Sequence, residues 1–136
     1  MNLDKHPYFE AYTNQKSGVT SYILTKRLAP IQQSFYFSNC SMTSDNKYLW
    51  FYCAYPPATA HTLGVVSLDE NNPFIRQFPQ SQFDEGSPVI SPDNSGVYFT
   101  IRDEVYFIDT EGNTRLIAKL SPDLVRNRPV FHACTT

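Results

Sequence analysis

Short apolar runs alternate with polar turns along this chain of 136 residues, and one such unit occurs twice. The first copy spans residues 39–53 and the second spans residues 88–101. Their turn aspartates, Asp45 and Asp93, lie 48 positions apart (93 − 45). Short runs rich in aromatic and β-branched side chains between polar turns predict strands. A repeat of roughly 40 to 50 residues made of such strands is typical of β-propeller blades, each a sheet of four antiparallel strands.

The repeat divides the chain into a predicted partial propeller of about two and a half blades. Residues 7–25 are expected to form the outer hairpin of a closing blade, and residues 32–78 the first complete blade. Residues 87–120 form the second predicted blade, and residues 129–136 begin a third. The pattern therefore predicts an all-β protein.

Within the first predicted blade, residues 32–41 are expected to be the inner strand, and residues 48–54 a second strand that is covered on both faces. Residues 55–62 are predicted to be a loop, because paired prolines do not fit a central strand ladder. Asp69 and Asp109 lie only 40 positions apart (109 − 69). The difference of 8 from the first offset predicts an eight-residue insertion between the second and third strands of the first blade.

Closure of the ring is the main question that the repeat raises. A propeller usually has about four to eight blades, and two and a half blades alone would expose unpaired strand edges. We therefore expect these residues to be the amino-terminal portion of a longer propeller of about seven blades, or a truncated gene product. A compact β-sandwich built from the same strands is the alternative.

Composition limits the classes of partner. The net charge is −2 with acidic and basic residues interspersed, so no basic surface is predicted for nucleic acid or an anionic membrane. No apolar run approaches the roughly 20 residues that span a bilayer, and the amino terminus lacks the apolar core of a secretory signal. These features favour a cytoplasmic protein. Cys40, Cys53 and Cys134 contain no CxxC pair and are predicted to be buried free thiols.

Four basic residues are candidates for ligand binding. His61 lies in the predicted inserted loop, where it could act as a base or ligand, although a lone loop histidine is more often solvated. His132 begins the third predicted blade and could face the central channel. Arg126 and Arg128 suit bidentate capture of carboxylates. Ordinary surface arginines, or an ion pair with Asp123, explain this pair equally well.

Other conspicuous residues are predicted to be structural. The recurring turn aspartates are followed by Asn46 and Asn94, which indicates an Asx-type turn. The adjacent carboxylates Asp84 and Glu85 favour turn chemistry, and His6 is expected on the surface of the terminal arm. Aromatic residues of the predicted second strands are expected to pack between blades rather than to stack on a sugar; they are Trp50, Phe51, Tyr98 and Phe99.

Three segments resemble the amino-terminal part of the oligogalacturonate lyases. The opening Phe9-Glu10-Ala11-Tyr12, with Ser17-Gly18 and Leu24-Thr25, resembles that family's FExYxDxxTGxxVxxLT pattern. The stretch from Phe35-Tyr36-Phe37 through Cys40 to Asp45-Asn46-Lys47-Tyr48-Leu49-Trp50-Phe51 is similar to its YFYxxCFTxDGxxLLF pattern. Ser91-Pro92-Asp93 with Val105-Tyr106-Phe107-Ile108-Asp109 resembles its second blade. The chain departs from the family at Gln32-Gln33-Ser34, where a His-Arg often precedes the aromatic triplet.

The resemblance implies a propeller enzyme that cleaves short oligogalacturonides by metal-assisted β-elimination. A histidine base would remove the proton at C5, while manganese or a similar divalent cation would neutralise the substrate carboxylate. The family's catalytic and metal-binding groups lie in later blades, so no residue here is matched to them. This chain alone is expected to bind no cation and to be inactive.

Two other classes stay open, because the second and third segments are patterns shared by many propellers. The chain could belong to a non-catalytic binding platform similar to the periplasmic Tol-system component. It could also be the propeller domain of a prolyl-peptidase-type hydrolase, which predicts a separate catalytic domain.

Overall fold

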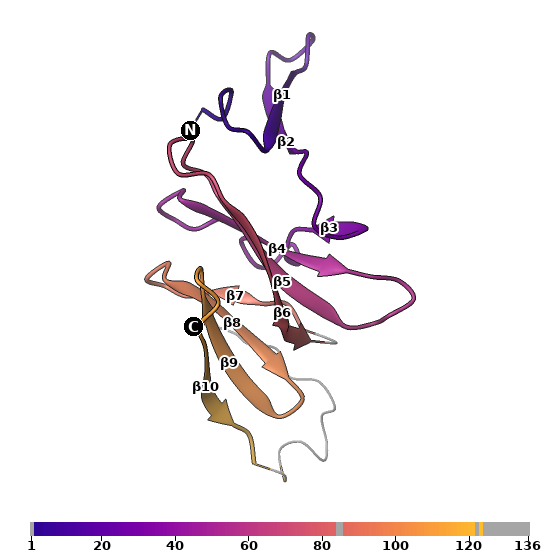
Figure 1. Ribbon diagram of the computed structural model, residues 1–136, viewed down its shortest axis with the longest axis vertical. Helices are drawn as coiled ribbons and strands as arrows, with labels where there is room; N and C mark the ends of the chain where they lie inside the picture. The colour runs from indigo at the N-terminus through magenta and orange to yellow at the C-terminus, as the bar shows by residue number, and fades with distance from the viewer. Residues whose placement is uncertain (1, 84–85, 122, 124–136) are drawn as a thin grey trace.

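The computed structural model of the protein describes residues 2–83, 86–121 and 123. The described chain is all-β, as the sequence predicts, and its strands form three antiparallel sheets (Figure 1). Among the described residues, no helix has the length and apolar character needed to cross a membrane. The strands are β1 (Phe9–Thr13), β2 (Thr20–Leu24), β3 (Ile31–Gln33), β4 (Tyr48–Ala54), β5 (His61–Ser67), β6 (Ile75–Phe83), β7 (Val89–Ile90), β8 (Gly96–Ile101), β9 (Glu104–Asp109) and β10 (Thr114–Lys119).

Each of the two larger sheets is a meander in which consecutive strands are neighbours. The first sheet has the order β3-β4-β5-β6, and the second has the order β7-β8-β9-β10. Strands β1 and β2 form a separate hairpin. Figure 1 shows the hairpin, the first sheet and the second sheet following one another along the long axis of the molecule.

The predicted inner strand over residues 32–41 is confirmed only at its start, because β3 ends at Gln33. Strand β3 pairs only with the last three residues of β4, and the next pairing of this edge is an isolated bridge between Met42 and Leu49. Residues 34–41 therefore leave the edge of the sheet and return to it. The excursion is held by Phe35, whose side chain is buried in the core and whose N–H donates to Ser41 Oγ at 2.6 Å. The buried ring fastens the excursion to the core between the two sheets.

The predicted eight-residue insertion is also corrected, to six residues. The ladder pairs Trp50 with Val65 in the first sheet and Tyr98 with Phe107 in the second. The third strands are thus offset by 42 positions (107 − 65), six fewer than 48. The turn aspartates used for the prediction do match as turns, because Asp69 and Asp109 each accept the backbone N–H two residues on. The connections between the third and fourth strands differ in length in the two sheets, however. The spacing of these aspartates therefore does not give the offset between the third strands.

Strand bounds in the first sheet are wider than predicted. Strand β5 begins at His61, so the predicted loop over residues 55–62 ends two residues early. Strand β6 continues past the predicted limit of residue 78 through an irregularity in its pairing with β5. Ser81 stabilises this irregularity, because its buried hydroxyl accepts the Leu63 N–H at 2.8 Å and donates to the Phe78 carbonyl at 2.6 Å. The Ser81 hydroxyl thus takes the place of a backbone partner in the ladder. The sequence pattern does not predict this role.

The main core lies between the two four-stranded sheets. Trp50 is fully buried at its centre, with its ring centroid 5.8 Å from that of Phe78. The buried side chains of this cluster come from both sheets and from the excursion; they are Phe35, Trp50, Leu63, Val65, Phe78, Phe83, Val97, Phe99 and Ile108.

A second core covers the opposite face of the first sheet. Phe51, Cys53 and Val66 are buried there against Ala29 and the amino-terminal segment, which contributes partly buried apolar residues including Tyr8, Phe9 and Leu24. Strand β4 is therefore covered on both faces, as predicted. His6 belongs to this amino-terminal segment and is only 2% exposed, so its predicted surface position is wrong. Its ring is edge-on to Tyr8 and Phe9, with centroids 5.5 and 5.1 Å away.

The two sheets stack head to tail. Positions 51 and 99 are equivalent in the repeat (51 + 48), and each faces the element that precedes its own sheet: Phe51 faces the amino-terminal segment, and Phe99 faces the first sheet. Trp50 faces the second sheet, so its equivalent, Tyr98, points away from the first sheet. Tyr98 is half-buried beside Phe107, with ring centroids 5.2 Å apart. Tyr98 was predicted to be buried between blades, but the described residues cover it only partly.

Gly96, the first residue of β8, provides a test of this packing. A Cβ at this position would lie 2.1 Å from the Ile108 carbonyl oxygen and 2.6 Å from the Phe107 ring. Because a backbone atom cannot move aside cheaply, Gly96→Ala should lower the free energy of unfolding by about 3 kcal/mol. Urea unfolding followed by Trp50 fluorescence measures the change.

Gly18→Ala is the matched control for that substitution. Gly18 has φ +70°, but a Cβ added there would meet no atom within 4 Å, so only backbone strain of about 1 kcal/mol applies. If the two variants lose the same stability, the close approach at Gly96 does not limit the packing.

Candidate functional site

Three of the four residues proposed from the sequence, Arg126, Arg128 and His132, lie outside the described residues, as do Asp84 and Glu85.

His61 lies at the first position of β5 and not in a solvated loop. It pairs with Ala54 and Phe83 in the ladder and is half-buried. Its ring lies edge-on to Tyr52 with centroids 4.9 Å apart, and 5.6 Å from the Phe83 ring. The imidazole closes the end of the main core as an aromatic packing group. The described contacts support a structural role for it.

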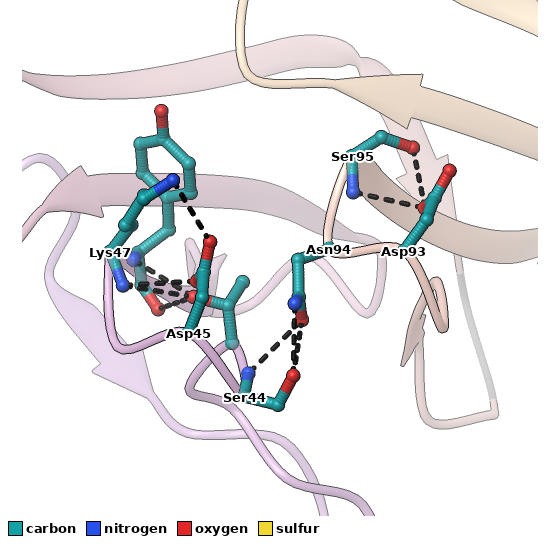
Figure 2. Close-up of polar contacts among 8 residues, drawn as sticks. Ser44, Asp45, Lys47, Asp93, Asn94 and Ser95 are labelled. Carbon is teal, nitrogen blue, oxygen red and sulfur yellow. Dashed lines mark hydrogen bonds and ion pairs between the residues drawn. The ribbon is translucent and has the colours of Figure 1, made fainter.

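The recurring aspartates form the Asx turns that the sequence predicts, as Figure 2 shows. Asp45 Oδ1 accepts the Lys47 N–H at 3.2 Å, and Asp93 Oδ1 accepts the Ser95 N–H at 3.1 Å. Hydrogen bonding by Thr43 lowers the pKa of Asp45, and hydrogen bonds from Ser91 and then Ser95 lower the pKa of Asp93 to about 2. The carboxylates therefore stay ionised to hold the turns.

The two turns also contact each other. Asn94 Oδ1 accepts the N–H of Ser44 at 3.0 Å, and its Nδ2 lies 2.9 Å from the Ser44 hydroxyl (Figure 2). Asn46 and Asn94 both have positive φ, 58° and 60°, a conformation that asparagine tolerates. Of these two asparagines, only Asn94 links the two sheets through its side chain. No hydrogen bond among the described residues uses the Asn46 side chain. These polar residues are structural.

A better candidate for ligand binding is a hollow at the β3 edge of the first sheet. It has a volume of about 240 Å³ and is open to solvent on one side. It lies where residues 34–41 leave the sheet, so that the edge of β4 around Trp50 lacks a continuous neighbouring strand. Its walls come from the end of the hairpin, the crossover after it, the start of the excursion and the adjoining part of β4: Leu24, Arg27, Gln32, Gln33, Ser34, Leu49, Trp50 and Phe51.

Gln32 fixes the wall of this hollow. Its side-chain oxygen accepts the backbone N–H groups of Leu28 and Ala29, and its Nε2 donates to the Lys26 carbonyl at 3.3 Å. These bonds fold the crossover into a compact loop and place Arg27 at the edge of the hollow. Gln32, at one of the positions where the chain departs from the lyase pattern, therefore has a defined structural role.

Three polar side chains of the hollow are available to a ligand. Arg27, Gln33 and Ser34 are exposed, and within residues 2–83, 86–121 and 123 no hydrogen bond or ion pair uses their side chains. A guanidinium group beside an amide and a hydroxyl can bind a carboxylate together with neighbouring hydroxyl groups. The hollow thus suits a small polar anion.

An exposed aromatic pair lies on the same excursion. Phe37 is 88% exposed and Tyr36 is 62% exposed, with ring centroids 4.3 Å apart. The Tyr36 N–H donates to Ser87 Oγ at 3.1 Å, and Asn39 Nδ2 donates to the Pro88 carbonyl at 3.1 Å. The excursion is therefore anchored to the start of the second sheet while it presents two rings to solvent.

The manganese site that the resemblance implies was expected in later blades and not in this chain. No group of three or more His, Cys, Asp or Glu side chains among the described residues is arranged to hold a metal ion. The buried Cys53 thiol is unreactive, because desolvation raises its pKa to about 11, and Cys40 is exposed, contrary to its predicted burial.

Comparison with known proteins identifies no relative: no family profile, curated protein or solved structure matches this chain.

The repeat supplies its own control for the contact between turns. Asn94→Gly keeps the positive φ but removes the bonds to Ser44, so it should cost about 1 kcal/mol of unfolding free energy. Asn46→Gly keeps φ and removes no inter-sheet bond, so it should change stability by less than about 0.5 kcal/mol. Thermal or urea unfolding of the two variants gives the comparison. Equal losses would mean that the Ser44–Asn94 contact does not join the sheets.

The low pKa of Asp93 predicts a pH dependence. A carboxyl whose pKa falls from 3.8 to about 2 on folding stabilises the protein above the unfolded value. That contribution is lost as pH falls through about 4 to 2, because the unfolded chain takes up the proton more readily. NMR titration of the side-chain carboxyl should give the value near 2. Asp93→Asn should flatten the stability profile over that interval, and an unchanged profile would contradict the assignment.

Proposed function

We propose that the two four-stranded sheets are successive blades of a β-propeller of which this chain forms the amino-terminal part. The head-to-tail stacking of the sheets supports this most directly. When the same face of each repeat always meets the opposite face of its neighbour, the contact is heterologous and can continue until a ring closes. In a sandwich of two repeats related by a two-fold axis, equivalent faces would meet, which would place Tyr98 opposite Trp50.

The outer face of the second sheet is suited to continue the series. Tyr98 is half-buried and Phe107 is buried beneath it, and the Arg115 guanidinium lies 4.7 Å from the Phe107 ring centroid. The equivalent face of the first sheet carries Trp50, which the second sheet covers completely. A third sheet would bury the Tyr98 face in the same way.

For the whole protein we propose an oligogalacturonate-lyase-like activity, in which short galacturonides are cleaved by β-elimination. The resemblance of the opening segment supports this reaction, and the free guanidinium group of Arg27 beside a sugar-sized hollow supports an acidic sugar as the ligand. A divalent cation such as manganese would stabilise the charge that develops on the substrate carboxylate. The described residues take no catalytic step in this scheme; they build the scaffold and a part of the binding surface.

A non-catalytic binding platform is the second candidate. The exposed Tyr36–Phe37 pair favours it, because two large rings in solvent are unusual unless they meet a ligand or partner.

The reaction tests the proposal. The longer protein that carries this chain, incubated with unsaturated digalacturonate and manganese, should release a product with altered ultraviolet absorbance. Chelation of the metal should abolish the change, and neutral digalactose should not react. The 136-residue chain alone should be inactive. If the longer protein binds digalacturonate but forms no product with any divalent cation tried, the binding platform replaces the enzyme.

A further inference from the structure

We propose that the hollow at the edge of the first sheet binds one uronic acid residue, with Arg27 contacting its carboxylate. The choice of ligand rests on the proposed function, whereas the existence of an anion site rests on the geometry alone. This assigns a ligand-binding role to the crossover between the hairpin and the first sheet.

The charge of Arg27 is the first argument. Arg76 donates to the Thr110 carbonyl at 2.7 Å and to Glu111 at 2.6 Å, and Arg115 covers the Phe107 ring. Arg102, like Arg27, has no such contact among the described residues, but it does not line the hollow. Arg27 has no such partner among the described residues, although its loop is fastened by the Gln32 side chain, which accepts two backbone N–H groups and donates to one carbonyl. A guanidinium group on a fixed loop with no protein partner is prepared to accept a carboxylate with two parallel hydrogen bonds.

The size and lining of the hollow limit the ligand further. About 240 Å³ is below the roughly 300 to 1,000 Å³ of sites that enclose a drug-sized molecule, so one sugar ring fits better than an oligomer. The open side lets the rest of a longer chain extend into solvent. Leu24 and Leu49 offer apolar surface to the C–H face of a pyranose, while Gln33 and Ser34 can exchange hydrogen bonds with its hydroxyl groups. The combination selects a charged sugar over a neutral one.

A binding measurement tests this inference without reference to catalysis. Because the Trp50 indole is fully buried in the core, occupancy is measured directly, by isothermal titration calorimetry or by the shift of backbone amide signals around Arg27 in NMR spectra. Galacturonate should produce a saturable change with a dissociation constant in the millimolar range, and galactose should bind at least about ten-fold more weakly. Equal responses to the two sugars would overturn the role of the carboxylate.

Two substitutions locate the site. Arg27→Gln should weaken galacturonate binding by about ten-fold or more, and Arg27→Lys, which keeps the charge but not the planar fork, should give a smaller loss. Arg115→Gln is the matched control, since it removes the same charge from the second sheet and should leave binding unchanged. Unfolding curves confirm that each variant is folded. Full binding by Arg27→Gln, or equal losses in the Arg27 and Arg115 variants, would place the ligand elsewhere.

The outcome separates this inference from the proposed function. If the longer protein cleaves digalacturonate while Arg27→Gln leaves galacturonate binding intact, the Arg27 site is wrong and the lyase proposal stands. If galacturonate binding depends on Arg27 but no cleavage occurs, the anion site stands and the enzymatic proposal fails.

Discussion

Burial of β4 on both of its faces is the constraint on which the rest of the structure depends. Trp50 and Phe51 are consecutive residues, so their side chains leave the strand on opposite sides, and both are buried. Each contributes about 2–3 kcal/mol if fully removed from water. That gain requires the second sheet on one side and the amino-terminal segment on the other. The indole N–H of Trp50 finds no acceptor among the described residues, which reduces the gain on that side.

The same constraint explains the role of the β1–β2 hairpin. A two-stranded hairpin is marginally stable by itself in water, and most of β1 is exposed. Tyr8, Phe9 and Leu24 hold it to the Phe51 face of the first sheet. The hairpin and the sheet stabilise each other, and the Arg27 hollow lies at the junction between them, so its shape depends on their contact.

Local signals in the sequence predicted local structure well. Strand β4 has its predicted bounds, and the Asx turns at Asp45 and Asp93 follow from residues within a few positions. One departure depends on a long-range contact, because residues 34–41 leave the ladder where the Phe35 side chain is buried in the core between the sheets. The other is local: the rings of Tyr8 and Phe9, two and three residues on, lie edge-on to the buried ring of His6. Neither the burial of Phe35 outside a strand nor that of His6 can be predicted from the residue type at that position.

The candidate site was harder to predict for the same reason. A lone arginine in a crossover is not distinctive, and the break in the strand ladder beside the hollow, over residues 34–41, has no signal in the sequence pattern. His61 stands out in the sequence as an isolated histidine, yet its neighbours in space are the aromatic rings of Tyr52 and Phe83. The departure of Gln32-Gln33-Ser34 from the lyase pattern argued against a family-like sugar contact at this segment, so no pattern in the sequence singled out the hollow.

The contact between Ser44 and Asn94 has a consequence for how such sheets find their order during folding. The position equivalent to Ser44 in the second repeat is Pro92 (44 + 48), which has neither an N–H nor a hydroxyl group to offer. In the proposed propeller, an asparagine from a third blade could not form the same pair there. Successive junctions would then be chemically different, and the two described sheets could not exchange places without losing these hydrogen bonds.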